Sequence, residues 1–150
     1  MAFVSERIPK EDWSMYNSWE LKDPMRKPLL EREFAHWVAD RERKAYFCGL
    51  GGHGFDAPWA YALMWDGNYI LVWVLDSMRR NADSSKDWCY NISHIWAPKT
   101  LSDKSDEIVE LIKEALSAKF IQNPKNSHLG VAFINVATPR FVESVKEVVV

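Results

Sequence analysis

The side chains that most often bind metals or carry out acid–base chemistry are widely spaced in this sequence. The four histidines are His36, His53, His94 and His128, and no two of them form a His-x-His or His-x-x-x-His pair. A metal site in a protein needs three or four ligands that converge on one point. The spacing shows no such convergence, so we predict neither a metal nor any other cofactor.

The two cysteines, Cys48 and Cys89, lack the surroundings of a catalytic nucleophile. Both fall inside segments that we predict to be strands. Neither lies at a helix start or at a glycine-rich elbow, the settings that lower the pKa of a thiol. Two isolated cysteines also form neither a disulfide framework nor a zinc site. We expect two reduced thiols in the core of a protein that is not an enzyme.

The glycine-rich stretch Gly49–Asp56 is a candidate for a phosphate-binding loop. Such a loop directs backbone N–H groups from the start of a helix, and the Walker pattern adds a lysine and a hydroxyl residue. Both residues are missing here, and a strand is predicted to follow Pro58. We interpret the stretch as a connection between strands. Within it, His53 and Asp56 are candidates for contact with a partner.

Charged side chains gather on one predicted helix and at one predicted turn. Acidic residues in the first turn of a helix are favoured by its dipole, but this series extends further and includes a like-charge pair four residues apart. A solvated face is one interpretation, and an acidic surface that meets a basic partner is the other. The acidic residues are Asp103, Asp106, Glu107, Glu110 and Glu114, and the turn carries Arg41 and Arg43.

The elements that position these residues predict a single domain, residues 1–150, of the α+β class. We expect a mainly antiparallel sheet of about five or six strands, with two helices packed on one face. Residues 76–87 are predicted to be a polar loop, and residues 141–150 fit either a helix or a strand. The candidate strand segments are 3–8, 34–39, 45–50, 61–65, 69–75, 88–96 and 129–136. The helices are expected at 10–19 and 106–120.

The clearest unit is the hairpin formed by Tyr61–Trp65 and Tyr69–Leu75. Asp66-Gly67 lies between the two strands, and this dipeptide favours a tight turn because both residues tolerate positive φ. Both strands are apolar at consecutive positions, so we expect the hairpin to be covered on both faces. The second helix has an apolar stripe that should pack on the sheet, formed by Ile108, Leu111, Ile112, Ala115 and Leu116.

Large aromatic side chains, including eight Trp, five Tyr and seven Phe, allow two interpretations. Strict alternation along 88–96 would place Trp88, Tyr90, Ile92, His94 and Trp96 on one face. Together with the aromatic residues of the hairpin at 61–75, they could line a pocket for a planar ligand. The other interpretation is a core beneath the helices. We favour the core because the helix at 106–120 needs an apolar surface to pack on.

Overall composition excludes several classes of partner. A formal net charge of −2 lacks the basic surplus of a nucleic-acid-binding protein. No apolar run approaches the ~20 residues of a membrane helix. The first residues become charged too early for a signal peptide. We therefore predict a cytoplasmic protein that is a monomer or homodimer, with no nucleic acid or membrane partner.

Two stretches of the sequence carry a family resemblance. One is Phe3–Pro9 with Asp12 and Trp13, and the other is Trp37–Arg43. They resemble small bacterial immunity proteins that are encoded beside polymorphic or contact-dependent toxins. The resemblance implies a cytoplasmic protein that binds one cognate toxin domain and blocks it without catalysis. It assigns no functional residue.

The main hypothesis is therefore an immunity protein that neutralises a toxin through a protein–protein interface. A second hypothesis is a small half-barrel enzyme or ligand-binding protein with an aromatic-lined pocket. In that protein His53 or His94 would be the acid–base group, with Asp56 or Asp66 nearby. A third hypothesis is a subunit of a larger assembly, in which exposed aromatic side chains form the interface.

Overall fold

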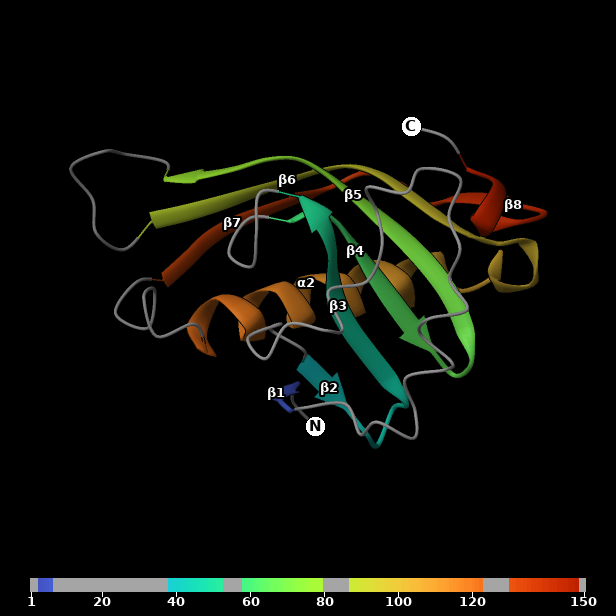
Figure 1. Ribbon diagram of the computed structural model, residues 1–150, viewed down its shortest axis with the longest axis horizontal. Coiled ribbons are helices and arrows are strands. Elements are labelled where there is room, and N and C mark those ends of the chain that lie inside the picture. Colours follow the sequence, from blue (N-terminus) through green and yellow to red (C-terminus); the bar gives the residue numbers. More distant parts are fainter. Residues whose placement is uncertain (1–2, 7–37, 53–57, 80–86, 123–129, 149–150) are drawn as a thin grey trace.

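The computed structural model describes residues 3–6, 38–52, 58–79, 87–122 and 130–148. This part of the chain forms one mainly antiparallel sheet of eight strands that curls around a single α-helix (Figure 1). The expected α+β class is confirmed, but the expected five or six strands are too few. The predicted helix at 10–19 lies outside the described residues, as do His53 and Asp56.

The strands follow the chain order across the sheet from β1 to β7, and β8 also pairs with β6. Pairs from β1 to β6 are antiparallel, whereas β7 and β8 run parallel to β6. A parallel neighbour requires a crossover connection, and α2 lies in the crossover from β6 to β7. The elements are β1 (Val4–Ser5), β2 (Val38–Asp40), β3 (Ala45–Gly52), β4 (Pro58–Trp65), β5 (Asn68–Arg79), β6 (Asp87–Pro98), η3 (Lys99–Leu101), α2 (Ser105–Gln122), β7 (Gly130–Val136), β8 (Arg140–Val142) and η4 (Val145–Glu147).

Several element boundaries differ from those expected from the sequence. Residues 76–79, predicted as a polar loop, continue β5 because they pair with residues 88–91 of β6. Backbone pairing therefore overrides the polar side chains of this segment. The segment that fitted either a helix or a strand contains the end of β8 and the 3₁₀ turn η4.

The predicted hairpin is confirmed in both its turn and its two-sided burial. Asp66 and Gly67 have φ of 48° and 79°, the pair of positive angles that a type I′ turn requires. Tyr61 and Leu63 face the core that contains α2, whereas Ala62 and Met64 belong to a second buried cluster on the opposite face. The sheet is therefore buried on both sides at its centre.

Two bulges overturn the expected alternation along β6. Trp73 pairs with His94 but Val74 pairs with Ile92, so Ser93 is an extra residue on β6. Leu75 is the corresponding extra residue on β5. An extra residue shifts the following side chains to the other face. The predicted single row is therefore wrong, because Tyr90 lies in the core with α2 and Trp96 lies in the opposite cluster.

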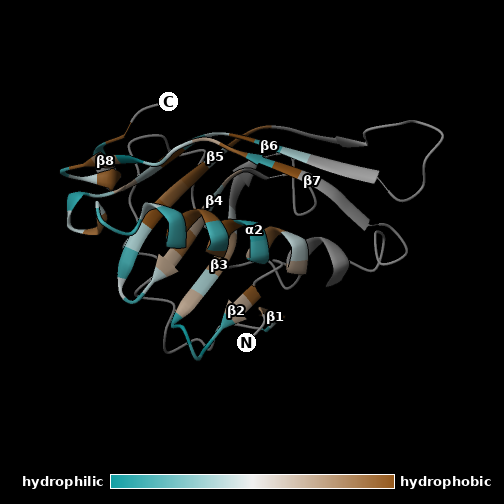
Figure 2. Cartoon of the chain, turned by 180° about the vertical axis from the view of Figure 1, so that it is seen from behind, coloured by the Kyte–Doolittle hydropathy of each residue, from teal (hydrophilic) through white to brown (hydrophobic). Residues whose placement is uncertain are grey.

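The helix α2 fills the concave side of the sheet. All five residues of its predicted apolar stripe are 2% exposed or less, so this prediction is confirmed. They pack against aromatic and aliphatic side chains from the sheet, among them Phe47, Tyr61 and Ile95. The hydrophilic residues of α2 lie on its outer side, which faces the viewer in Figure 2. The fold therefore presents one face of this helix to solvent on a fixed support.

Candidate protein-binding surface

The acidic residues predicted from the sequence form one surface, which we call the acidic stripe. Its members are Asp103, Asp106, Glu107, Glu110 and Glu114, and all five are exposed. At 3.6 residues per turn, the four helical members lie within an arc of about 100°. At 1.5 Å per residue, they extend over about 12 Å along α2. The structure thus brings these carboxylates together, as the helical spacing predicted.

The stripe is joined to the β2–β3 turn by Arg43. The Nη2 group of Arg43 donates to Oε2 of Glu114, and its Nε donates to Oδ2 of Asp40 at 2.6 Å. The backbone N–H of Arg43 also donates to Oδ1 of Asp40, at 3.2 Å. Arg43 and Glu114, both candidates from the sequence, are therefore direct partners. Their shared role could not be predicted, because 71 residues separate them.

Asp40 is the buried end of this network. Asp40 lies at the end of β2 and is 2% exposed. Burial opposes its negative charge, but the side-chain and backbone hydrogen bonds from Arg43, together with the guanidinium charge, outweigh that effect. The pKa of Asp40 is consequently held below its ordinary value. Asp40 therefore stays ionised and orients Arg43 toward α2.

Arg41, the other predicted basic candidate, points to a different partner. Its Nη2 lies 2.6 Å from Oε1 of Glu6, and its side chain is 60% exposed. The Glu6 side chain is 19% exposed, so only the arginine end of this ion pair is open to solvent. Arg43 also lies over the ring of Phe3, with 5.5 Å between the guanidinium carbon and the ring centroid. The two arginines of one turn thus both contact the N-terminal segment.

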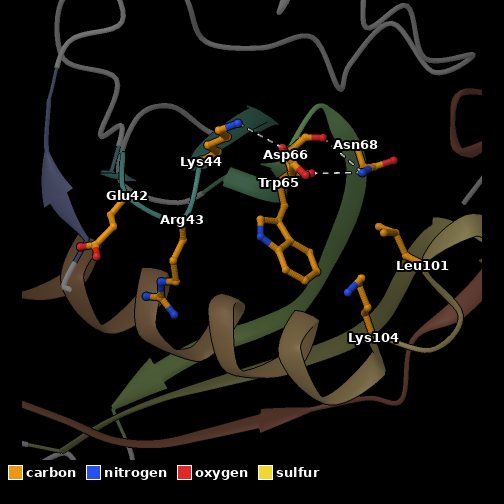
Figure 3. Close-up of a pocket in the computed structure, with 8 residues that line it drawn as sticks. All are labelled: Glu42, Arg43, Lys44, Trp65, Asp66, Asn68, Leu101 and Lys104. Carbon is orange, nitrogen blue, oxygen red and sulfur yellow. Dashed lines mark hydrogen bonds and ion pairs between the residues drawn. The ribbon is translucent and has the colours of Figure 1, made fainter.

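A pocket lies beside the stripe, where the β2–β3 and β4–β5 turns approach the start of α2 (Figure 3). The backbone N–H of Asp66 donates to the carbonyl of Lys44 at 2.9 Å, which fixes one turn against the other. Trp65 points from its strand toward α2, between Arg43 and Lys104. The pocket has a volume of about 260 Å³.

This pocket could not be predicted from the sequence. Its walls come from segments around residues 42–44, 65–68 and 101–104. They meet because Ala45 pairs with Trp65, which places the two turns at the same end of the sheet. The Asp66-Gly67 turn and the charged turn that carries Arg41 and Arg43 were both recognisable in the sequence. Their adjacency depends on strand register, which local sequence patterns do not determine.

The histidine of β6 makes contacts that do not fit an acid–base pair with Asp66. His94 stacks on Trp96 with ring centroids 5.0 Å apart, and its Nδ1 lies 3.0 Å from Oγ of Ser93. The Ser93 hydroxyl donates to the carbonyl of Trp73 at 3.4 Å. His94 pairs with Trp73, which lies five residues along β5 from Asn68, or about 17 Å at 3.3 Å per residue, and Asp66 lies in the turn just before Asn68. The suggested proximity of His94 and Asp66 is therefore wrong.

The buried thiol of Cys48 and the buried phenols of Tyr61 and Tyr90 are held in their neutral forms. Burial raises the pKa of the Cys48 thiol well above its ordinary value, although a backbone hydrogen bond involving Ala62 acts in the opposite direction. Burial likewise raises the pKa of Tyr61 and of Tyr90. A thiol with a raised pKa is a poor nucleophile at neutral pH. Cys48 therefore has the properties of a core residue, as expected.

No group of three or more His, Cys, Asp and Glu side chains in the described ranges could hold a metal ion. No helix within the same ranges is long and apolar enough to cross a membrane.

Comparisons with known proteins found no matching family model, curated protein or solved structure.

Proposed function

We propose that this chain is a non-catalytic binding protein that recognises a basic protein partner through the acidic stripe. In its most specific form, the proposal is an immunity protein that neutralises a cognate bacterial toxin domain. The observation that carries it is the group of exposed carboxylates on α2, whose opposite face is buried in the core. The stripe is therefore a preorganised charged surface, which lowers the cost of ordering on binding.

The charges of the stripe favour a basic partner. Glu110 and Glu114 are four residues apart on the helix, and such a like-charge pair mildly destabilises an isolated helix. Arg43 offsets this repulsion at Glu114, whereas no ion pair is found for Asp106, Glu107 or Glu110 in the described structure. These three carboxylates are available to a partner's lysines and arginines. Complementary charge of this kind chiefly increases the rate of association.

The toxin as the partner is supported by the resemblance of residues 3–9 and 37–43 to immunity proteins. The part of these stretches that the structure describes lies close to the network around Arg43. Glu6 pairs with Arg41, and Asp40 pairs with Arg43. Because Arg43 also pairs with Glu114, Asp40 and Arg43 lie next to one end of the acidic stripe.

The alternative hypothesis is a half-barrel protein that binds a ligand inside the curved sheet. The curl of the sheet favours it, since such sheets can enclose a pocket. However, Tyr61 and Tyr90 are part of the hydrophobic core that includes α2. The aromatic side chains of the concave face thus stabilise the domain, which favours the binding-surface proposal.

Co-expression with the product of the adjacent gene tests the immunity role. We expect the two proteins to co-purify and the chain to protect cells from that product. The role is rejected if the adjacent gene encodes no toxin and co-expression protects no cell.

A pair of matched double variants tests the surface. Glu107→Gln with Glu110→Gln removes two charges from the stripe, and Glu143→Gln with Glu147→Gln removes two from the C-terminal region. We expect the first pair to slow association with the partner about fivefold or more at low salt, and the difference to shrink at about 0.5 M salt. The control pair should change the rate less than about twofold. Equal effects of the two pairs would argue against the stripe.

A further inference from the structure

The pocket beside the acidic stripe has no role in the proposed function. A cavity of about 150 Å³ can hold one benzene ring, and drug-sized ligands need about 300 Å³ or more. The volume here, about 260 Å³, suits a single ring with a short substituent. Trp65 and Leu101 provide apolar surface in the pocket wall. The size and these two residues favour a small, flat, partly apolar ligand.

The polar groups of the wall are mostly hydrogen-bond donors. Arg43, Lys44 and Lys104 carry donors and no acceptor, and the indole N–H of a tryptophan is a donor only. Arg43 is already bound to two carboxylates, so it shapes the wall without supplying free charge. Glu42 and Asp66 are the acidic members of the wall. The excess of donors favours a ligand that carries an acceptor group.

Lys44 is only weakly held by Asp66. The distance between Nζ of Lys44 and Oδ1 of Asp66 is 3.8 Å, and both side chains are more than 70% exposed. An ion pair of this length and exposure contributes almost nothing to stability. Lys44 can therefore turn toward a ligand at little cost.

Of the three basic residues in the wall, Lys104 would gain most from a negatively charged partner. In the described part of the chain it forms no ion pair, and its Nζ lies 5.9 Å from the centroid of the Trp65 ring. An exposed cation–π contact at this distance compensates weakly for a missing counter-charge. Figure 3 shows the Lys104 ammonium directed toward the indole. A carboxylate placed beside the ring would meet this ammonium directly.

We infer that the pocket binds a small carboxylate attached to a flat apolar group. The ring lies against Trp65 and Leu101, and the carboxylate accepts hydrogen bonds from Lys104 and Lys44. The two turns that form the wall are held by the Asp66–Lys44 backbone hydrogen bond and by the pairing of Trp65 with Asn68. The site is thus largely preformed, and it does not depend on the proposed function.

Titration of the ¹⁵N-labelled protein with phenylacetate tests the inference. The readout is the indole N–H resonance of Trp65, identified by its loss in Trp65→Phe. We expect phenylacetate to cause a saturable shift of this resonance. Phenylacetamide, which has the same ring and no charge, should bind more weakly by about fivefold or more. Lys104→Gln should weaken phenylacetate binding about tenfold, and Lys104→Arg should retain most of it.

Lys113→Gln is the matched control. Like Lys104→Gln it removes one positive charge, but Lys113 lies on α2 and does not line the pocket. We expect it to change binding less than about twofold. The inference is overturned if phenylacetate and phenylacetamide bind equally, if Lys113→Gln and Lys104→Gln have equal effects, or if no saturation occurs up to about 10 mM.

The same carboxylate chemistry has two sources, a free aromatic acid or the C-terminal phenylalanine of another protein. A second titration with N-acetyl-Gly-Phe, which has a free carboxylate, distinguishes them. Tighter binding of the peptide than of phenylacetate assigns the site to a protein terminus, and the reverse assigns it to a free acid.

Discussion

Arg43 and Glu114 form an ion pair that joins the β2–β3 turn to the outer face of α2. Arg43 also holds Asp40, so a buried carboxylate and an exposed one share one guanidinium. The two partners should differ in their effect on stability. Loss of the guanidinium leaves Asp40 without its partner in the described network, whereas loss of the Glu114 charge leaves Asp40 and Arg43 paired.

We therefore predict that Arg43→Ala lowers the free energy of unfolding by about 2 kcal/mol. The value lies below the ~3–5 kcal/mol typical of a broken buried pair because the Arg43 side chain is 35% exposed. Glu114→Gln should cost about 0.5 kcal/mol or less. Urea unfolding of each variant gives these values. Arg41→Ala, from the same turn, is the control and should cost about 1 kcal/mol or less because the Arg41 side chain is 60% exposed. An equal cost for Arg41→Ala and Arg43→Ala would contradict the prediction.

Stability should also depend on pH through Asp40. Its pKa in the folded protein lies below the ordinary value of 3.8, so the unfolded chain binds the proton more readily. The stabilisation is therefore fully present above the unfolded pKa and is lost as the pH falls through the folded value. We expect unfolding curves to show a steep loss of stability below about pH 4. The loss should be smaller in Asp40→Asn, and an unchanged slope in that variant would exclude Asp40 as the cause.

The elements that could be predicted from the sequence are those determined by local pattern. The Asp66-Gly67 turn and the apolar stripe of α2 follow from backbone preference and helical period, and both are confirmed. The course of β6 could not be predicted, because the bulge at Ser93 depends on pairing with β5. A single extra residue was enough to reverse the predicted direction of Trp96.

The candidate site shows the same division between local and distant information. The acidic stripe was predictable, since its members are close in sequence and four of the five lie on one helix. The contact of Arg43 with Glu114 and the pocket around Trp65 depend on packing between distant segments. Both require the curvature of the sheet, which brings the two turns close to α2 and to the segment before it.

The β4–β5 turn should be sensitive to backbone conformation alone. Gly67 has φ of 79°, and a Cβ built at this position meets nothing within 4 Å. Gly67→Ala should consequently lower the free energy of unfolding by about 1 kcal/mol through backbone strain without any clash. Gly67→Asn should cost less, because asparagine tolerates positive φ. Thermal unfolding of both variants tests this, and equal costs for alanine and asparagine would indicate that strain is not the cause.

Cys48 should react with thiol reagents only when the sheet opens. Its side chain is 1% exposed, and burial raises its pKa, so little thiolate forms at neutral pH. In a Cys89→Ser background, Cys48 is the only thiol of the chain. We expect its labelling by a chromogenic disulfide reagent at pH 8 to be slow in the native protein. Labelling should become fast across the urea unfolding transition, in step with the loss of structure measured by circular dichroism. Rapid labelling of the native protein would show that the second buried cluster opens locally, and would contradict the assignment of Cys48 to the core.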